Sequence, residues 1–244
     1  MFIGIDLGTS ALKAILIDES QKIIGHASHT LAISNPQDGY YEQDPESWFE
    51  ATVKCFQELY SSHKKEFSSV KGIGISGQMH GATLIDKKGT ILRPCILWND
   101  TRSFKECALM EKNYPSIRNE TGNVAMPGFT APKILWIKKN EYEIFKNIYK
   151  IFLPKDYLRF RLTNSYYTDM SDASGTLWLN VKDRKWSDNL LELTGLNTSF
   201  MPNLVEGSEP TEYLSNEIKN KFGFQKKVIV AGGSGDQAAG AIGS

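Results

Sequence analysis

Residues 2–13 read Phe-Ile-Gly-Ile-Asp-Leu-Gly-Thr-Ser-Ala-Leu-Lys. The first five of these residues are typical of a buried strand, and apolar residues resume between Leu12 and Asp18. Leu-Gly-Thr-Ser between them has the composition of a tight turn, so the segment predicts a β-hairpin. A third strand is predicted at residues 23–31, after a polar turn at residues 19–22. The chain therefore begins with a meander of three antiparallel strands.

The segment that follows the meander predicts one helix and further strands. Asp44 and Pro45 are typical of a helix N-cap and of the first helical turn. Apolar or small side chains then recur at helical spacing, at Trp48, Thr52, Phe56 and Leu59. Residues 70–76 predict a strand, and residues 82–86 and 90–92 predict a hairpin. This order of elements indicates a layered α/β domain.

From about residue 100 the pattern changes to helices. They are predicted at residues 103–112, 131–139, 141–148, 155–162 and 188–194. Strand character returns only at residues 227–230. We therefore expect a helix-rich insertion or cap, at roughly residues 101–200, that interrupts the sheet.

Composition excludes several classes of function. Lysine plus arginine and aspartate plus glutamate both number 28, so the formal net charge is zero, which argues against a nucleic-acid or anionic-membrane partner. The three cysteines, Cys55, Cys95 and Cys107, have neither zinc-site spacing nor a disulfide pattern. The chain begins directly with a strand rather than a signal peptide, and no apolar run is long enough to span a bilayer. These features predict a cytoplasmic protein.

A second stretch, residues 228–240, reads Val-Ile-Val-Ala-Gly-Gly-Ser-Gly-Asp-Gln-Ala-Ala-Gly. A short apolar strand runs into a glycine-rich loop, and Asp236 stands where a helix of small residues begins. Glycines let a ligand approach the backbone closely, and the first N–H groups of a helix attract anions. Asp236 is therefore expected to work at a phosphate-bearing site.

The first hairpin carries a complementary set of polar groups. Thr9 and Ser10 offer hydroxyl and N–H donors to phosphate oxygens, and Lys13 neutralises their charge. Asp6 ends the first strand and is expected to hold a magnesium ion, directly or through water. The spacing is not that of a Walker A loop, and no Gly-x-Gly-x-x-Gly segment opens a helix as in dinucleotide-binding domains.

The chain carries an Asp-x-Gly-Thr hairpin near its start and a Gly-Gly-x-x-Asp-Gln loop near residue 236. This pair of motifs resembles the FGGY family of carbohydrate kinases, a branch of the ribonuclease-H-like, actin-like ATPases. Further segments that resemble the family lie at residues 75–81, 97–102, 128–137 and 169–176. The resemblance covers residues 1–244 in order and implies an N-terminal sugar-binding domain of that α/β fold, in which a mixed sheet with flanking helices follows the meander. It also implies a C-terminal nucleotide-binding domain that is absent from this chain.

Met79-His80 separates the branches of the family, because glycerol kinases carry Arg-Glu in the comparable place. The pair resembles the xylulokinases, which implies transfer of the γ-phosphate of ATP to the C5 hydroxyl of D-xylulose with Mg²⁺. In that interpretation Asp236 takes the hydroxyl proton, and Met79, His80, Asp236 and Gln237 contact the sugar. Because the nucleotide-binding half is missing, the chain alone is expected to be inactive.

Trp98 and Arg102 are further candidates for sugar contact, by stacking on the ring face and by bonding a hydroxyl. Arg102 bracing Asp100 is the alternative. Lys133 and Trp136 are interpreted as architectural, and Asp172 as a local helix or turn cap. A kinase for gluconate, ribulose, glycerol or another polyol stays open, as do a non-catalytic sugar-binding module and a homodimer.

Overall fold

The predicted meander forms the start of the main sheet in the computed structural model, which describes residues 1–243. Strands β1 (Phe2–Leu7), β2 (Ala11–Ile17) and β3 (Ile23–Thr30) pair antiparallel in sequence order. β1 ends at Leu7 and β2 begins at Ala11, so the turn between the two strands lies at residues 8–10. The predicted hairpin is therefore present.

The rest of the main sheet is mixed, as predicted. β5 (Gly72–Gly77) runs parallel to β1, and β14 (Ile229–Ala231) runs parallel to β5 on its other side. After a short loop the chain returns to β5 as β15 (Ser234–Gly235), also parallel. The sheet ends in β13 (Pro210–Tyr213), antiparallel to β14. The sequence did not predict β13, because its Pro-Thr-Glu-Tyr composition suits only an edge strand.

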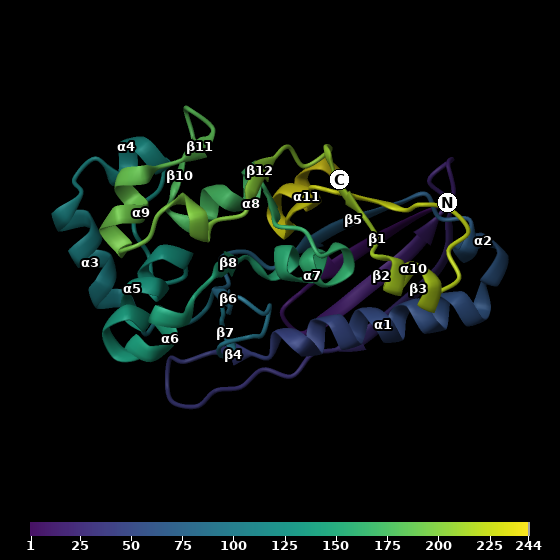
Figure 1. Cartoon of the computed structure of the whole chain (residues 1–244), viewed down its shortest axis with the longest axis horizontal. Coiled ribbons are helices and arrows are strands. Elements are labelled where there is room, and N and C mark those ends of the chain that lie inside the picture. The colour runs from purple at the N-terminus through teal and green to yellow at the C-terminus, as the bar shows by residue number, and fades with distance from the viewer. Residues whose placement is uncertain (244) are drawn as a thin grey trace.

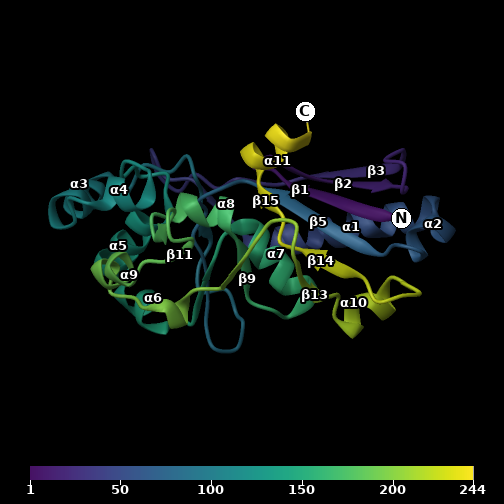
Figure 2. The ribbon, with the colours of Figure 1, turned by 90° about the horizontal axis from the view of Figure 1, so that it is seen from above.

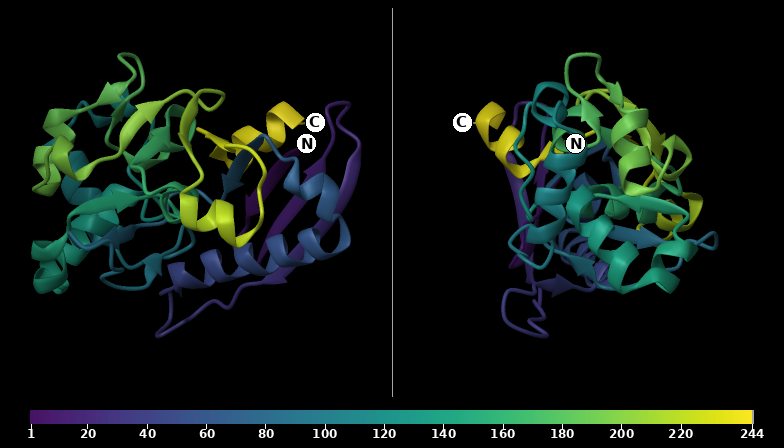
Figure 3. Two further views of the ribbon diagram at one scale, coloured as in Figure 1. Left: turned by 45° about the vertical axis from the view of Figure 1, so that its right-hand side comes forward. Right: turned by 90° about the vertical axis from the view of Figure 1, so that its left-hand side faces the viewer.

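One face of the sheet is covered by helices and the other is largely open. Figure 2 shows α1 (Pro45–Ser62), α7 (Pro154–Thr163) and α10 (Asn216–Lys221) on one side, with α11 (Asp236–Gly243) standing on the other. The end-on view of Figure 3 gives the same arrangement. The covered face packs apolar side chains of alternate strand positions against Trp48, Phe56 and Leu59 of α1. Asp44 caps α1 as predicted, accepting a hydrogen bond from the Glu46 N–H at 3.0 Å.

The helix-rich part forms a second core beside the sheet (Figure 1). The predicted helices are present as α3 (Phe104–Asn113), α5 (Thr130–Asn140), α6 (Tyr142–Asn147), α7 and α9 (Asp188–Thr194). The short helix α4 (Ile117–Thr121) was not predicted, because five residues are too few for a periodic signal. Across residues 1–243, no helix combines the length and the apolar character that a membrane crossing requires.

The hairpin predicted at residues 82–86 and 90–92 forms, but with little strand pairing of its own. β6 (Thr83–Ile85) pairs with β8 (Lys150–Phe152), while the second arm of the expected hairpin makes a single bridge, Ile85 to Ile91. The intervening turn does close, with the N–H groups of Lys88 and Thr90 bonded to Asp86. Arg93-Pro94 then interrupts the arm, since proline cannot donate to a ladder.

The remaining elements are short. They are α2 (Lys64–Ser68), α8 (Met170–Ala173), the 3₁₀ turns Ser174–Thr176 and Thr198–Phe200, and the strands β4 (Glu42–Gln43), β7 (Cys95–Ile96), β9 (Tyr167–Asp169), β10 (Leu179–Asn180), β11 (Lys185–Trp186) and β12 (Asn203–Val205).

Candidate functional site

Four polar side chains form one row across the open face of the sheet. Asp6 pairs in register with Lys13 on one side and with Ser76 on the other, and Ser76 pairs with Ser234. Ser76 Oγ donates to Asp6 Oδ1 at 3.0 Å. All four line a cavity of about 430 Å³, which Ala239 of α11 also borders. The sequence predicted Asp6 and Lys13 as site residues but neither serine. The serines join the row only through the register of the parallel strands.

This row fits a magnesium ion bound mainly by phosphate and water. Within residues 1–243, no cluster of three or more histidine, cysteine or acidic side chains is able to hold a metal by itself. Beyond the Ser76 bond, the Asp6 carboxylate has no other partner among the described residues. A single carboxylate with hydroxyls nearby is the donor set that Mg²⁺ uses beside nucleotide phosphates. The Lys13 ammonium in the same row suits the charge of those phosphates.

The hairpin turn is tied to Trp98 and Gln43. Thr9 Oγ1 accepts a hydrogen bond from Trp98 Nε1 at 3.0 Å, and the Thr9 carbonyl accepts one from Gln43 Nε2 at 2.9 Å. Trp98 is 49% exposed, so the indole holds the turn through its N–H while about half of the residue stays accessible. Ser10 is exposed. The sequence assigned Trp98 and Thr9 to sugar and phosphate separately, whereas the structure joins them.

Gln43 is a buried link that the sequence analysis did not identify. Its Oε1 accepts hydrogen bonds from Trp48 Nε1 at 2.7 Å and from Gln78 Nε2 at 2.9 Å, while its Nε2 donates to the carbonyls of Thr9 and Ala32. One amide therefore connects the hairpin turn to α1 and to the segment after β5. A single glutamine in a polar stretch carries no sequence signal of such a role.

His80 is held in a strained backbone turn directly after β5. Its φ is +66°, and the Gly81 N–H donates to the Met79 carbonyl at 2.8 Å. This bond, from residue i+2 to residue i, together with the positive φ marks the rare, strained form of the γ-turn. Such a conformation costs about 1–3 kcal/mol and is kept only where the surroundings enforce it, typically at functional sites.

The surroundings of His80 enforce this turn through its carbonyl. That oxygen accepts hydrogen bonds from Thr130 Oγ1 at 3.1 Å and from Lys133 Nζ at 2.9 Å. Lys133 also donates to the Gly128 carbonyl at 2.7 Å, and its side chain is fully buried. Burial lowers the pKa of Lys133 to about 7. Lys133 was predicted to be architectural, and its contacts show how: it holds the backbone of His80, a candidate sugar contact.

The imidazole of His80 has a defined tautomer. Nδ1 lies 2.8 Å from the Gly175 carbonyl, which only accepts, so Nδ1 carries the proton. The ring also meets Phe129 edge-on, with ring centres 4.6 Å apart. Burial lowers the pKa of His80 to about 4, aided by the Lys133 charge and opposed by the Gly175 bond. At neutral pH the ring is therefore uncharged, and Nε2 is a hydrogen-bond acceptor suited to a hydroxyl group.

Asp236 follows a glycine loop that passes very close to other backbone. Gly233 has a φ of +71°, and a Cβ there would lie 2.0 Å from the Ile75 carbonyl oxygen. Met79 packs on Gly235, where a Cβ would lie 2.7 Å from Met79 Cγ. Asp236 is half-buried, and its Oδ1 accepts from the N–H of Gln237, whose own side chain is exposed. The structure thus brings the Met79-His80 turn next to the segment that carries Asp236.

Arg102 does not join this group. Its guanidinium bonds both oxygens of Asp100, pairs with Glu42 at 2.7 Å, and lies 3.9 Å from the centre of the Tyr40 ring. The same guanidinium lies 5.0 Å from the ring centre of Trp136, which is half-buried. Of the two roles considered for Arg102, the bracing of Asp100 is the one with observed contacts, and the ion pair is buried.

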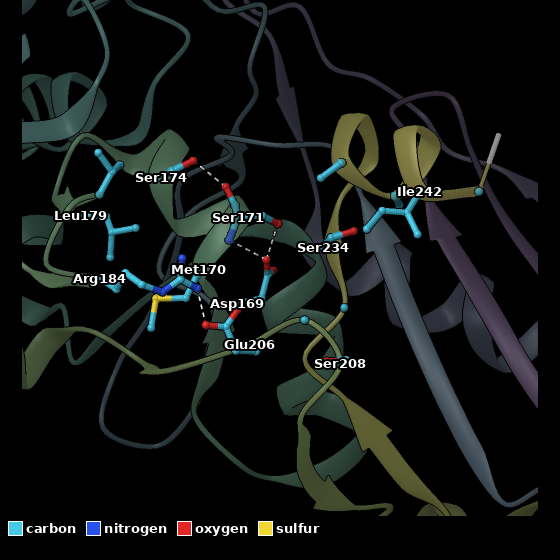
Figure 4. A pocket seen from close by; sticks show the side chains of 16 residues that line it. Asp169, Met170, Ser171, Ser174, Leu179, Arg184, Glu206, Ser208, Ser234 and Ile242 are labelled. Atoms are coloured by element: carbon cyan, nitrogen blue, oxygen red, sulfur yellow. Dashed lines mark hydrogen bonds and ion pairs between the residues drawn. The ribbon is translucent and has the colours of Figure 1, made fainter.

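The interpretation of Asp172 as a cap was wrong. Asp169 caps α8, with its Oδ2 accepting from the N–H groups of Ser171 and Asp172; Figure 4 shows the contact with Ser171. Asp172 is instead fully buried, 3.2 Å from Lys155 Nζ. Burial raises the pKa of Asp172 to about 8. The sequence could not reveal this, because Lys155 and Asp172 meet only through the packing of α7 against α8.

Comparisons with known proteins identify the family to which the chain is similar. Residues 1–243 match the N-terminal domain of the FGGY family of carbohydrate kinases. Xylulose kinase of Escherichia coli K12 is 49% identical over 243 residues, which cover 100% of this chain and 50% of that protein. The crystal structure of a xyloylose (xylulose) kinase from Brucella ovis has a TM-score of 0.96 and 52% identity, covering 97% of this chain and 49% of that one.

A gluconate kinase from Lactobacillus acidophilus has the same fold at greater distance. Its structure gives a TM-score of 0.90 with 26% identity, covering 96% of this chain and 48% of that chain. The chain therefore spans about half the length of the relatives that it matches.

The role of Lys133 predicts a change in the pKa of His80. In Lys133→Met the imidazole loses a neighbouring positive charge, so the His80 pKa should rise above about 4. The His80 and Gly128 carbonyls also lose a donor, which should lower the free energy of unfolding by about 1–3 kcal/mol. Imidazole NMR titration and urea unfolding measure the two effects. Lys139→Met, on the exposed end of the same helix, is the control, and equal behaviour of the two variants would contradict the assigned role.

The lowered pKa of His80 also predicts a pH dependence of stability. Between about pH 6.5 and pH 4 the unfolded chain binds a proton that the folded chain does not, so stability falls as the pH falls. The expected loss from His80 is about 2 kcal/mol, reduced for its partial exposure. Because Asp172 titrates with the opposite sign, the quantity to measure is the difference between wild type and His80→Asn across this range. A difference that is independent of pH would refute the assignment.

Proposed function

The chain belongs to the FGGY family of carbohydrate kinases, and from this we propose that it supplies the sugar site and catalytic base of an ATP-dependent xylulose kinase. The reaction transfers the γ-phosphoryl group of ATP to the C5 hydroxyl of D-xylulose and gives D-xylulose 5-phosphate and ADP. The partner in the reaction is the C-terminal, nucleotide-binding domain of this family, because the chain spans about half the length of its relatives.

The observation that carries this proposal is the pairing at the end of β5. Asp6 and Lys13 share one row with Ser76 and Ser234, and Asp236 follows directly after the strand that carries Ser234. Phosphoryl transfer depends on the positioning of two substrates and on charge neutralisation more than on covalent chemistry of the protein. A phosphate-binding row adjoining a carboxylate with one oxygen uncommitted within residues 1–243 is the arrangement that this reaction requires.

Asp236 acts as the general base. It accepts the proton of the C5 hydroxyl while the oxygen forms its bond to the γ-phosphorus and the bond from that phosphorus to ADP breaks. One oxygen of the carboxylate bonds the neighbouring N–H, and no bond to the second is seen among the described residues. A carboxylate suffices, because in a loose transition state the hydroxyl loses its proton late.

His80 and Met79 hold the sugar beside Asp236. The imidazole Nε2 accepts a hydrogen bond from a sugar hydroxyl, and the thioether of Met79 forms an apolar wall. Trp98 offers its accessible surface to the sugar while its Nε1 holds the Thr9 turn. Gln237, exposed at the start of α11, is placed in the sugar or phosphate contacts, and Arg102 acts on this site only by bracing Asp100.

The first hairpin binds the phosphates of ATP. Thr9, Ser10 and Lys13 contact phosphate oxygens, and Asp6 holds a magnesium ion directly or through water. When bound, that ion neutralises the charge of the phosphates. Closure of the second domain over this cavity excludes water and thereby protects ATP from hydrolysis.

The sugar preference needs a separate test, since a gluconate kinase shares the fold. A coupled ADP-release assay of the two-domain kinase on D-xylulose, gluconate, D-ribulose and glycerol distinguishes them. We expect the highest kcat/KM on D-xylulose. A higher value on another sugar would reassign the substrate, and no turnover on any of them would refute the proposed activity.

The role of Asp236 gives a direct prediction. In the two-domain kinase, Asp236→Asn should lower kcat by about 10³-fold, the middle of the range for loss of a general base. The Kd for D-xylulose, from calorimetry, should change little, because the remaining sugar contacts are intact. Asp188→Asn makes the same change at the start of α9 and serves as the control. Turnover of Asp236→Asn within a few-fold of wild type would exclude Asp236 as the base.

A further inference from the structure

The loop from Ala231 to Gly235 determines where Asp236 lies. Its N–H groups are bonded on one side: Gly232 donates to the Glu209 carbonyl at 2.9 Å, and Gly233 donates to the Gly207 carbonyl at 2.8 Å. On the other side the loop touches β5 so closely that Gly233 has no room for a Cβ. The carbonyl groups of the loop therefore need partners from a third direction.

Arg159 of α7 supplies those partners. Its Nε donates to the Ala231 carbonyl at 3.3 Å, and its Nη2 donates to the Gly232 carbonyl. Its Nη1 donates to the Tyr167 carbonyl at 2.8 Å and to Asp156 Oδ1 at 2.9 Å. The side chain is fully buried, so these bonds are made without competition from water. Each nitrogen of the guanidinium is thus used, and two of the three bond the loop.

A buried ionic cluster fixes Arg159 in turn. Asp156 also binds Lys155 Nζ at 2.6 Å, and Lys155 binds Asp169 at 2.6 Å and Asp172 at 3.2 Å. The cluster contains two cations and three carboxylates, and the raised pKa of Asp172 lets one proton balance the charge at neutral pH. Asp172, the last member of the cluster, lies next to the other end of the loop, since a Cβ on Gly235 would lie 3.3 Å from its Oδ1. The cluster therefore contacts the loop at both of its ends.

We propose that Arg159 is a positioning residue for catalysis, which sets the place of Asp236 by holding the Ala231 and Gly232 carbonyls. Within the described part of the chain, the hydrogen bonds of Arg159 go to the loop, Asp156 and Tyr167, and none goes to His80 or Trp98. Its loss therefore displaces the base, while His80 and Trp98, which stand on other segments, keep their places. A displacement of about 1 Å at a reacting group lowers the rate by about 10²-fold.

The test uses Arg159→Met and Arg159→Lys in the two-domain kinase, with Arg161→Met as the matched control. Arg161 is two residues further along α7, where it pairs with Glu46 and bonds Tyr157 away from the loop. We expect kcat for D-xylulose to fall about 10- to 100-fold in Arg159→Met, with KM within about threefold of wild type. Arg159→Lys should lose less, because it keeps the charge and a donor, although a lysine cannot make the forked contacts.

A second readout uses the 244-residue chain and does not depend on activity. Hydrogen exchange of the Gly232 and Gly233 amides should accelerate at least tenfold in Arg159→Met and stay unchanged in Arg161→Met. This inference rests on the proposed function for its kinetic part only. An inactive wild-type kinase would refute the proposed function, and the exchange result would still decide the role of Arg159. Unchanged exchange, or a rise in KM with unchanged kcat in an active kinase, would overturn the proposal.

Discussion

Parallel pairing of β5 with strands on both of its sides is the constraint on which the site depends. β1 lies on one side of β5, and β14 followed by β15 lies on the other. Because parallel strands end at the same edge, Leu7, Gly77 and Gly235 stand in register there. The segments that continue from these residues carry the hairpin turn, the Met79-His80 turn and Asp236. Residues from three distant parts of the chain thus meet without any contact between their own side chains being required.

Bringing these segments together causes local backbone strain and buries charged side chains, and other contacts of the fold stabilise both. His80 keeps a positive φ because Thr130, Lys133 and Gly175 together fix its carbonyl and its ring. Gly233 passes the β5 backbone at a distance that admits no side chain. Buried charges are retained only with partners, as for Lys155 among three carboxylates. Each of these unfavourable features lies beside the candidate site, where it fixes the positions of the site residues.

The sequence predicted the parts of the fold that local chemistry determines. The glycine turn of the first hairpin, the Asp44-Pro45 helix start and the long amphipathic helices are each decided by neighbouring residues, and all formed. Their order indicated a layered α/β domain, and the resemblance to the family implied its actin-like fold. Short or edge elements such as β13 and α4 were missed, because their residues carry no periodicity. The pairing of β6 with β8 was missed because β8 lies far along the chain and pairs with β6 in addition to the local arm.

The candidate site divides in the same way. Asp6, Lys13, Met79, His80 and Asp236 stand in motifs and were predicted, whereas Ser76, Ser234, Gln43 and Arg159 act only through register or packing.

The central claim is that the ends of these strands form one sugar site. Titration of the ¹⁵N-labelled chain with D-xylulose tests it most directly by NMR. The account predicts that the amides of Gly81, Gly235 and Gln237 and the Nε2 of His80 shift together with one Kd, while Gly195 stays unmoved. Sugar binding that leaves these signals in place, or moves them with unrelated affinities, would contradict it.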